Sequence, residues 1–458
     1  MLWNSLSDEK FGDQLTSRVK DRKEIQAAFQ LFIQSHQKKP LVTSNVGKIV
    51  IHADKLLRFP RNILSDFDAS KTMIISAGIN TLRDKKTTLI SNKKRKKVRA
   101  LTTIQIVTKK NVKQKAENTK RHNSIPVISL NDYTSNTEKS VKQLQNKARA
   151  IFKSHKNHPL YTNTNFQNIF LDNISEIIKR IEQCKSFLNR VPVSCIVVST
   201  THSYISRIIS IVASERGIPT ICMQHGIISA EFGYLPKIAT IDAVYGNFEV
   251  DWYKKLGASM DSLEVIGHPR FDQAFHRPKI NRSKFERHLG LDRNKKTLMV
   301  VIRNNQDVNR WRTLIKTISE KVNVNILIKN YPSKLPHSLT NEFPFAYSTK
   351  NYDLYDIIPN VDCVVAYSST VGLEVMLAGK PLFILNETFP GYTGYYDGLE
   401  GMVHADPHKL GKLIIKYFIN PKWKNYAETK RIKFLSHAYP DFSMSGERLK
   451  KLINRLTS

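Results

Sequence analysis

Short apolar segments alternate with helical segments over much of this chain, and this alternation is the feature that most constrains its fold. From residue 193 onward the pattern predicts strands at 193–199, 218–223, 242–246 and 263–266, with helices at 203–216 and 249–256. Apolar strands separated by helices form parallel sheets that are covered on both faces. We therefore expect an α/β unit here.

The same alternation restarts at residue 297. Strands are predicted at 297–303, 322–329, 361–366 and 381–385, with helices at 309–320, 354–358, 371–378 and from 408 onward. The preceding residues are polar and charged, without a sustained strand pattern. We therefore predict an N-terminal domain over 1–267, an interdomain linker over 268–296 and a C-terminal domain over 297–458. Further strands are expected at 48–52, 71–76 and 125–130.

The net charge of the chain is +33, and much of it lies in one segment. Residues 83–121 contain fifteen Lys or Arg and two acidic residues, with a peak at 93–97. The alternating residues 101–107 predict one strand of a hairpin whose tip is the lysine cluster. Three interpretations stay open for this basic insertion: contact with nucleic acid, attraction to anionic lipid, and a solvated exposed loop.

Cysteine usage and the lack of long apolar runs indicate a cytoplasmic protein. The chain starts without the apolar core of a signal peptide, and no apolar run reaches the roughly 18 residues of a membrane span. Its four cysteines lie in apolar contexts and lack the C-x-x-C spacing of zinc sites: Cys184, Cys195, Cys222 and Cys363. We expect reduced, buried cysteines and no metal-ligand cluster.

His225 follows a predicted strand at the place where a reacting group is expected. The helix over 203–216 ends at Gly217, and the strand over 218–223 stops at Gln224-His225-Gly226. Ligands of open α/β sheets bind just beyond the carboxyl ends of the strands. His225 is therefore the candidate catalytic residue, and a buried structural histidine is the alternative.

A second candidate segment, 366–374, passes from a strand through three hydroxyl residues into a helix. A helix N-terminus has unpaired N–H groups and a positive dipole end, so it binds phosphate readily. Ser368, Ser369 and Thr370 add hydroxyl donors, and Glu374 is placed to accept hydrogen bonds from ribose. Ordinary helix capping by these hydroxyls is the alternative.

Four segments in a fixed order carry a resemblance to a known group: 217–226, 266–272, 367–374 and 378–381. With them, the chain resembles the GT-B-fold glycosyltransferases of bacterial surface-polysaccharide synthesis, which include capsule and lipopolysaccharide enzymes. It is more distantly similar to the teichoic-acid glycerophosphotransferases. The resemblance spans residues 193–385.

The resemblance implies two Rossmann-like α/β/α domains with the active cleft between them. A nucleotide-activated donor would bind the C-terminal domain at Ser368, Ser369, Thr370 and Glu374. An acceptor would approach from the N-terminal domain, where His225 matches the histidine-glycine motif of the group. These enzymes generally hold the diphosphate without a metal, and the nucleotide-sugar is a substrate, so no cofactor is expected.

One departure from the pattern of the group concerns the donor phosphate. The related enzymes often carry a lysine followed by a histidine-proline pair after the second strand of the C-terminal domain. Lys329 is present here, but Tyr331 stands where the histidine is expected, and a tyrosine carries no positive charge near neutral pH. Arg303, at the end of the first strand of that domain, is the candidate phosphate clamp in compensation.

The remaining residues of these motifs are predicted to line the cleft. For 267–272 we prefer packing between the domains and cleft lining to a catalytic role. The predicted cleft-lining residues are Gln224, Gly226, Gly267, Arg270 and Tyr331.

The function predicted first is transfer of a sugar from a nucleotide-sugar to a lipid-linked or oligosaccharide acceptor. A lipid-linked acceptor gives residues 83–121 a role in docking on the anionic inner face of the plasma membrane. A cytidine-nucleotide-dependent polyol-phosphate or sialic-acid-type transferase of the same fold is the alternative. A basic nucleic-acid-binding protein fits the charge but leaves the ordered motifs unexplained. A domain of this fold that binds without catalysis is the last interpretation, because of Tyr331.

Overall fold

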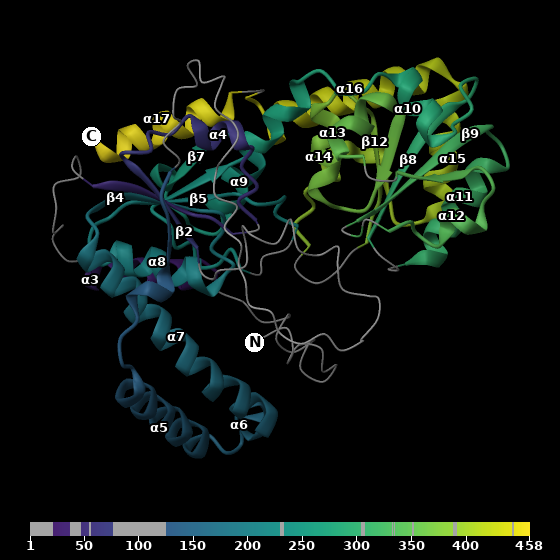
Figure 1. Ribbon diagram of the computed structural model, residues 1–458. Helices are drawn as coiled ribbons and strands as arrows, with labels where there is room; N and C mark the ends of the chain where they lie inside the picture. Colours follow the sequence, from purple (N-terminus) through teal and green to yellow (C-terminus); the bar gives the residue numbers. More distant parts are fainter. Residues whose placement is uncertain are drawn as a thin grey trace, which may run out of the picture.

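The protein contains two α/β/α domains, each with a central parallel sheet between helices (Figure 1). The computed structural model describes residues 22–36, 47–54, 56–76, 125–229, 233–303, 307–331, 333, 335–349, 352–387, 392–441 and 444–458. The two Rossmann-like domains predicted from the sequence are confirmed. The basic segment 83–121, with the strand predicted at 101–107, lies outside the described residues.

The first domain has a seven-stranded sheet in the order β3-β2-β1-β4-β5-β6-β7, and all its pairs are parallel. Its strands are β1 (Lys48–His52), β2 (Thr72–Ser76), β3 (Val127–Ser129), β4 (Val193–Val198), β5 (Thr220–Met223), β6 (Ile241–Val244) and β7 (Leu263–Val265). The residues of β4 alternate between the two faces of the sheet. Ile196 and Val198 belong to the apolar cluster on one face, and Cys195 and Val197 to the cluster on the other.

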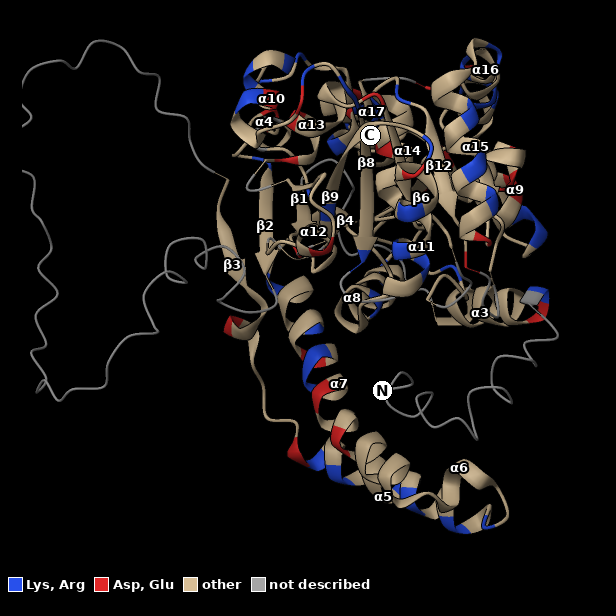
Figure 2. Ribbon diagram, turned by 90° about the vertical axis from the view of Figure 1, so that its right-hand side faces the viewer, with Lys and Arg blue, Asp and Glu red and all other residues tan. Residues whose placement is uncertain are grey.

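Helices cover both faces of this first sheet, and some of the helices project away from it. The helices of the first domain are α3 (Arg22–His36), α4 (Arg61–Ser65), α5 (Glu138–Ser154), α6 (Pro159–Thr162), α7 (Thr164–Arg190), α8 (Tyr204–Ser214) and α9 (Asn247–Lys255), with short 3₁₀ turns η2 (Leu130–Tyr133) and η3 (Met260–Ser262). Helices α7 and α8 pack on one face through residues such as Phe187 and Ile209. The α5–α6 pair and the outer part of α7 project from the domain as an arm that carries both charge signs (Figure 2).

The second domain has a six-stranded parallel sheet in the order β10-β9-β8-β11-β12-β13. Its strands are β8 (Lys296–Arg303), β9 (Val324–Tyr331), β10 (Ala346–Ser348), β11 (Cys363–Ala366), β12 (Leu382–Leu385) and β13 (Val403–His404). Central strands β8, β9, β11 and β12 coincide closely with the predicted ones. The edge strands β10 and β13 are short and only half-buried, so they lack the apolar run that predicts a strand.

Helices of the second domain surround one large apolar core. They are α10 (Arg282–Leu289), α11 (Val308–Ser319), α12 (Leu339–Glu342), α13 (Leu354–Ile357), α14 (Thr370–Leu377), α15 (Pro407–Ile419) and α16 (Pro421–Ala438), with 3₁₀ turns η4 (Pro269–Phe275), η5 (Ile358–Asn360) and η6 (Asp397–Met402). Helices α11 and α15 pack together beside the sheet, and α14 follows β11 directly.

The predicted linker over 268–296 differs from the structure. It contains η4 and α10, and Phe271 and Phe285 within it are fully buried in the core of the second domain. Most of its charged residues face outward, apart from the buried Arg270 and Glu286, while its few aromatic residues anchor it. The charged composition therefore concealed a packed segment that is part of the second domain.

The C-terminal helix α17 (Ser445–Thr457) also departs from the predicted division, which placed it in the second domain. It returns to the first sheet (Figure 1), where Leu449, Leu452 and Ile453 are buried in the same cluster as Val197 of β4. Arg448 Nε donates to the carbonyl oxygen of Ile266 at 3.0 Å. The chain therefore crosses between the domains twice, which ties them together.

We expect that truncating a buried residue of α17 destabilises the first domain. Leu449 is 0% exposed, so Leu449→Ala removes core contacts and should lower the free energy of unfolding by about 2–5 kcal/mol. The control Ile432→Ala, at a residue of α16 that is 55% exposed, should change it by less than about 0.5 kcal/mol. Urea unfolding followed by circular dichroism measures both. Equal effects would show that α17 is not part of the core.

Candidate active site between the two domains

A cavity of about 620 Å³ lies where residues after the carboxyl ends of strands in both sheets come together. The first domain contributes Arg58, His225, Gly226, Ile227 and Ser229. The second domain contributes Arg270 and Gln273 of η4, together with Arg303, Tyr331, Leu354, Tyr355, Tyr367, Ser368, Ser369, Thr370, Val371 and Glu374. The structure thus brings six of the seven predicted catalytic and donor-binding residues, and three of the five predicted cleft-lining residues, into one shared space.

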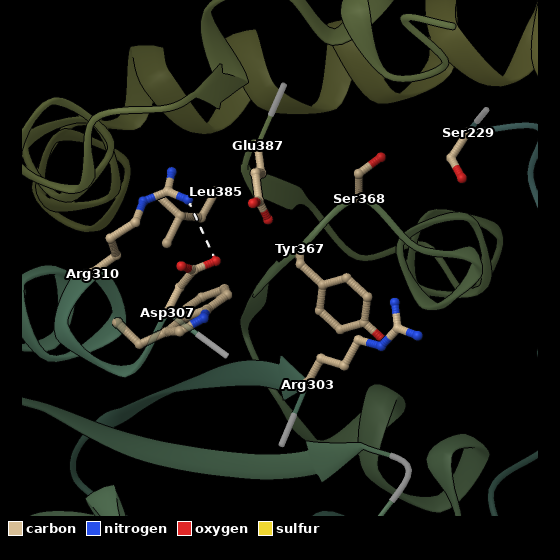
Figure 3. A pocket seen from close by; sticks show the side chains of 9 residues that line it. Ser229, Arg303, Asp307, Arg310, Tyr367, Ser368, Leu385 and Glu387 are labelled. Carbon is tan, nitrogen blue, oxygen red and sulfur yellow. Dashed lines mark ion pairs between the residues drawn. The ribbon is translucent and has the colours of Figure 1, made fainter. Parts of the chain in front are cut away.

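A smaller cavity of about 140 Å³ adjoins it on the side of the second domain (Figure 3). Arg303, Tyr367, Ser368 and Ser229 line both cavities. In Figure 3 the guanidinium of Arg303 lies beside the ring of Tyr367. Arg303 is exposed and therefore available to a ligand in either cavity.

Arg310 and Asp307 form the far wall of the smaller cavity. Their charged groups are 3.8 Å apart, and Arg310 Nη2 donates to the carbonyl oxygens of Asn386 and Ala405 at 2.7 and 2.5 Å. These bonds hold Arg310 in place between the start of α11 and the end of β12. Arg310 is therefore a structural residue, whereas Arg303 is the cation that faces the open space.

His225 lies two residues beyond the end of β5 and is partly buried in the wall of the larger cavity. Its ring is 4.7 Å from the ring of His202, in an edge-to-face arrangement. Burial, followed by the positive charges of Arg58 and Arg270, lowers the pKa of His225 to about 4. The imidazole is therefore neutral near pH 7, as a group that accepts a proton must be.

The end of β11 leads directly into α14, with Ser369 at the N-cap position. The side chain of Ser369 makes no capping hydrogen bond, and the buried hydroxyls of Ser368 and Ser369 lie beside the phenol groups of Tyr392 and Tyr367. Hydroxyl groups that lie at the positive end of a helix without capping it fit an anionic ligand better than ordinary capping. The Thr370 hydroxyl differs, since it accepts the N–H of Ile227 at 3.2 Å and so joins the two domains.

Arg270 of η4 and Glu374 of α14 form a buried ion pair in the wall of the larger cavity. Nη2 of Arg270 is 3.2 Å from Oε1 of Glu374, and the two residues are 5% and 7% exposed. Tyr355 donates its hydroxyl to the carbonyl oxygen of Arg270 at 3.1 Å. Burial raises the pKa of Glu374, and the charge of Arg270 opposes that rise. Nε of Arg270 has no hydrogen-bond partner in the described part of the chain.

Three predicted site residues do not line either of these cavities. Gln224 is 6% exposed behind the wall, where its amide donates to Glu249 at 2.7 Å and its oxygen accepts the N–H of Tyr245 at 2.9 Å. Gly267 has a φ of 70°, and a Cβ there would clash with the hydroxyl of Tyr439. Both residues are therefore structural supports of the strand ends.

Lys329 is the third of these residues. It lies inside β9, paired in register with Val301, whereas Tyr331 is the last residue of that strand, opposite Arg303. The cavities begin beyond the strand ends, so only the last pair, Arg303 and Tyr331, reaches them. Distance along the strand thus separates Lys329 from the predicted phosphate site.

Sequence reasoning missed Arg58, Gln273 and Tyr355, which also line the larger cavity. Arg58 follows strand β1, on the same edge of the sheet as His225. The available signal was a cation shortly after the carboxyl end of a parallel strand. That signal is weak, because an arginine in a loop is usually solvated.

The described part of the chain shows neither a metal-binding cluster nor a membrane span. No group of three or more His, Cys, Asp or Glu side chains in those residues could hold a metal ion. Among the same residues, no helix combines the length and the apolar character needed to cross a bilayer. Metal-independent chemistry stays a prediction from the sequence.

Residues 243–388 match the family model described as lipid-A-disaccharide synthetase, a glycosyltransferase family. The matched segment is about a third of the chain and runs from β6 to just beyond β12. It includes Arg270, Arg303 and the α14 N-terminus. The resemblance to GT-B glycosyltransferases is thereby confirmed for this segment. No curated protein matches the sequence.

Two solved structures illustrate how distant the likeness to known folds is. The wall teichoic acid polymerase TagF is 16% identical, with 60% of this chain and 74% of that chain covered and a TM-score of 0.41. The UDP-GlcNAc 2-epimerase from Neisseria meningitidis, bound to UDP-GlcNAc, is 11% identical, with 61% and 81% covered and a TM-score of 0.46. Similarity this distant carries no information about the substrate of this chain.

We expect Glu374→Gln to destabilise the protein, because it leaves the buried Arg270 charge without its partner. Loss of one member of a buried ion pair typically costs about 3–5 kcal/mol. The matched control is Glu264→Gln, which removes the partner of Arg455 in an exposed pair 2.8 Å apart and should cost less than about 1 kcal/mol. Urea unfolding measures both variants. Similar losses would contradict a special role for the buried pair.

The lowered pKa of His225 predicts a pH dependence of stability. Unfolded histidine titrates near pH 6.5 and the folded residue near 4, so the unfolded state binds more protons between these values. Stability should therefore fall as the pH decreases from about 6.5 towards 4, by up to roughly 3 kcal/mol from this residue.

Unfolding midpoints of wild type and His225→Asn between pH 4 and 8 measure this contribution. The variant should lose less stability at low pH than wild type. The control, His276→Asn at an exposed position, should follow wild type. Parallel curves for wild type and His225→Asn would contradict the buried, neutral state of His225.

Proposed function

We propose that this protein is a glycosyltransferase that moves a sugar from a nucleotide-sugar donor to a hydroxyl group of a glycan acceptor. One observation carries the proposal: a single cavity faces the hydroxyl-rich N-terminus of α14 on one side and the neutral His225 on the other. Group transfer needs these two elements, an anion site and a base. The glycosyltransferase family match over residues 243–388 supports the reaction class.

In this proposal, the second domain binds the donor. Its diphosphate lies at the N-terminus of α14, where the hydroxyls of Ser368 and Ser369 donate hydrogen bonds to it. Arg303, beside both cavities, stabilises the same negative charge. Glu374 accepts from ribose hydroxyls while it holds Arg270. Positively charged groups of the protein thus stabilise the leaving group.

His225 acts on the acceptor in the proposed reaction. The acceptor oxygen forms a bond to the anomeric carbon of the sugar while its proton passes to the imidazole of His225. The bond between that carbon and the diphosphate oxygen breaks, and the nucleoside diphosphate leaves with the electron pair. The helix N-terminus and Arg303 stabilise the charge that develops on the leaving oxygen.

Donor binding also makes His225 a stronger base. Two of the influences that lower its pKa are the positive charges of Arg58 and Arg270. A donor diphosphate brings negative charge beside these arginines and offsets their effect, so the pKa of His225 rises towards its ordinary value. Proton acceptance is then favoured in the complex with the donor.

The proposed class of acceptor is inferred from the sequence. A lipid-linked acceptor gives the basic residues 83–121 a role on an anionic membrane surface, where each Lys or Arg contributes about 1 kcal/mol. This segment lies outside the described residues, so peripheral attachment to the inner face of the plasma membrane stays a proposal. An oligosaccharide acceptor is the alternative.

A thermal-shift panel with UDP, CDP, CMP, GDP, dTDP and ADP tests the proposal. A ligand at 100 times its dissociation constant stabilises the folded state by about 2.7 kcal/mol. We expect one nucleoside diphosphate to stabilise wild type most, and Ser369→Ala to reduce its effect. The control Ser436→Ala, at an exposed position of α16, should behave as wild type.

The outcomes of the panel distinguish the proposed sugar transferase from the alternative functions. A preference for a cytidine nucleotide would indicate the polyol-phosphate or sialic-acid-type transferase instead. No stabilisation by any nucleotide, together with stabilisation by heparin or DNA, would overturn the transferase proposal and favour nucleic-acid binding. An effect unchanged in Ser369→Ala would mean that the nucleotide binds elsewhere.

A further inference from the structure

Arg58 reaches into the larger cavity from the first domain, in the connection between β1 and α4. Its Nη2 atom donates to the hydroxyl of Tyr331, the last residue of β9 in the second domain, at 3.4 Å. This is a long hydrogen bond between an exposed guanidinium and a neutral acceptor, so it is weak. Arg58 is therefore positioned across the cleft without being committed to a strong partner.

The backbone of Arg58 is held in an unusual conformation. Its φ is 50°, in the left-handed region that residues other than glycine seldom adopt. Both flanking residues are anchored: Leu57 is 4% exposed in the core, and the ring of Phe59 lies 5.8 Å from that of His268. Asp54 Oδ1 accepts the N–H of Leu57 at 3.1 Å. The surrounding structure thus imposes the strain, which is typical of functional positions.

The charge of Arg58 is not neutralised in the structure. No carboxylate of the described residues forms an ion pair with it, whereas Arg270 in the same cavity pairs with Glu374. Its positive charge lowers the pKa of His225, which places the guanidinium within electrostatic reach of the candidate base. An uncompensated arginine held at a cavity wall fits an anionic ligand.

We propose that Arg58 binds a phosphate group of the donor, so that binding of the nucleoside diphosphate draws on both domains. This inference rests on the proposed function. The weak bond to Tyr331 keeps the side chain across the cleft until the ligand arrives, and the phosphate then replaces the tyrosine hydroxyl as its acceptor. A purely structural alternative is that Arg58 serves only to link the domains through Tyr331.

Calorimetric titration with a nucleoside diphosphate and with the matching nucleoside tests this role. The pairs are UDP with uridine, CDP with cytidine, GDP with guanosine, dTDP with thymidine and ADP with adenosine. Arg58→Ala should weaken the diphosphate that binds wild type by about 10- to 100-fold, the usual effect of a lost charge-assisted hydrogen bond. Affinity for the nucleoside, which lacks phosphate, should stay within about 2-fold of wild type.

Further variants separate binding from structure. Arg58→Gly removes the cation but suits the positive φ, so its diphosphate affinity should fall as in Arg58→Ala even though the backbone strain is relieved. Arg58→Lys keeps a charge without the planar fork and should be intermediate. Tyr331→Phe removes only the hydroxyl and should change the affinity by less than about 3-fold. Lys139→Ala, an exposed charge on α5, is the matched control.

The outcomes distinguish this inference from the proposed function. Diphosphate affinity that is unchanged in both Arg58→Ala and Arg58→Gly overturns the role of Arg58 and leaves the transferase proposal standing. A loss in Tyr331→Phe as large as that in Arg58→Ala overturns it in favour of the domain link. Absence of binding by every nucleotide to wild type overturns both.

Discussion

The buried ion pair between Arg270 and Glu374 is the interaction on which the site depends. Two charges taken out of water are costly unless each compensates the other, so the pair holds the two elements that carry it in one arrangement. Arg270 belongs to η4, the segment that follows the first sheet, and Glu374 to α14, the helix whose N-terminus faces the cavity. The ion pair therefore fixes the helix of the anion site against the segment that leads out of the first domain, in the same cavity as His225.

Contacts across the domain boundary reinforce this arrangement. Ile227 donates its N–H to Thr370, and the N–H of Thr393 donates to the carbonyl oxygen of Ser229 at 3.2 Å. The return of α17 to the first sheet adds an apolar attachment away from the cleft. A ligand then meets donors and charges that are already in place, which is the condition under which electrostatic stabilisation is most effective.

Local patterns predicted most of the fold and part of the site. Central strands and the turn after β5 follow from apolar runs and glycine signals, so the sequence could place His225 and the hydroxyls before α14 at strand ends. Packing between segments that are far apart in the chain leaves no such local pattern in the sequence. The return of α17, the anchoring of Phe271 within a charged segment and the burial of Gln224 depend on partners far along the chain. Arg58 was missed because only the three-dimensional structure shows that its charge faces a cavity.

The most direct test of the account is a crystal structure of the protein with the nucleoside diphosphate that stabilises it most. The account predicts that the diphosphate lies at the N-terminus of α14, within hydrogen-bond distance of Ser368 and Ser369, with His225 facing the space beside it. A nucleotide bound outside the cavity between the domains, without contact to these hydroxyls, would contradict it.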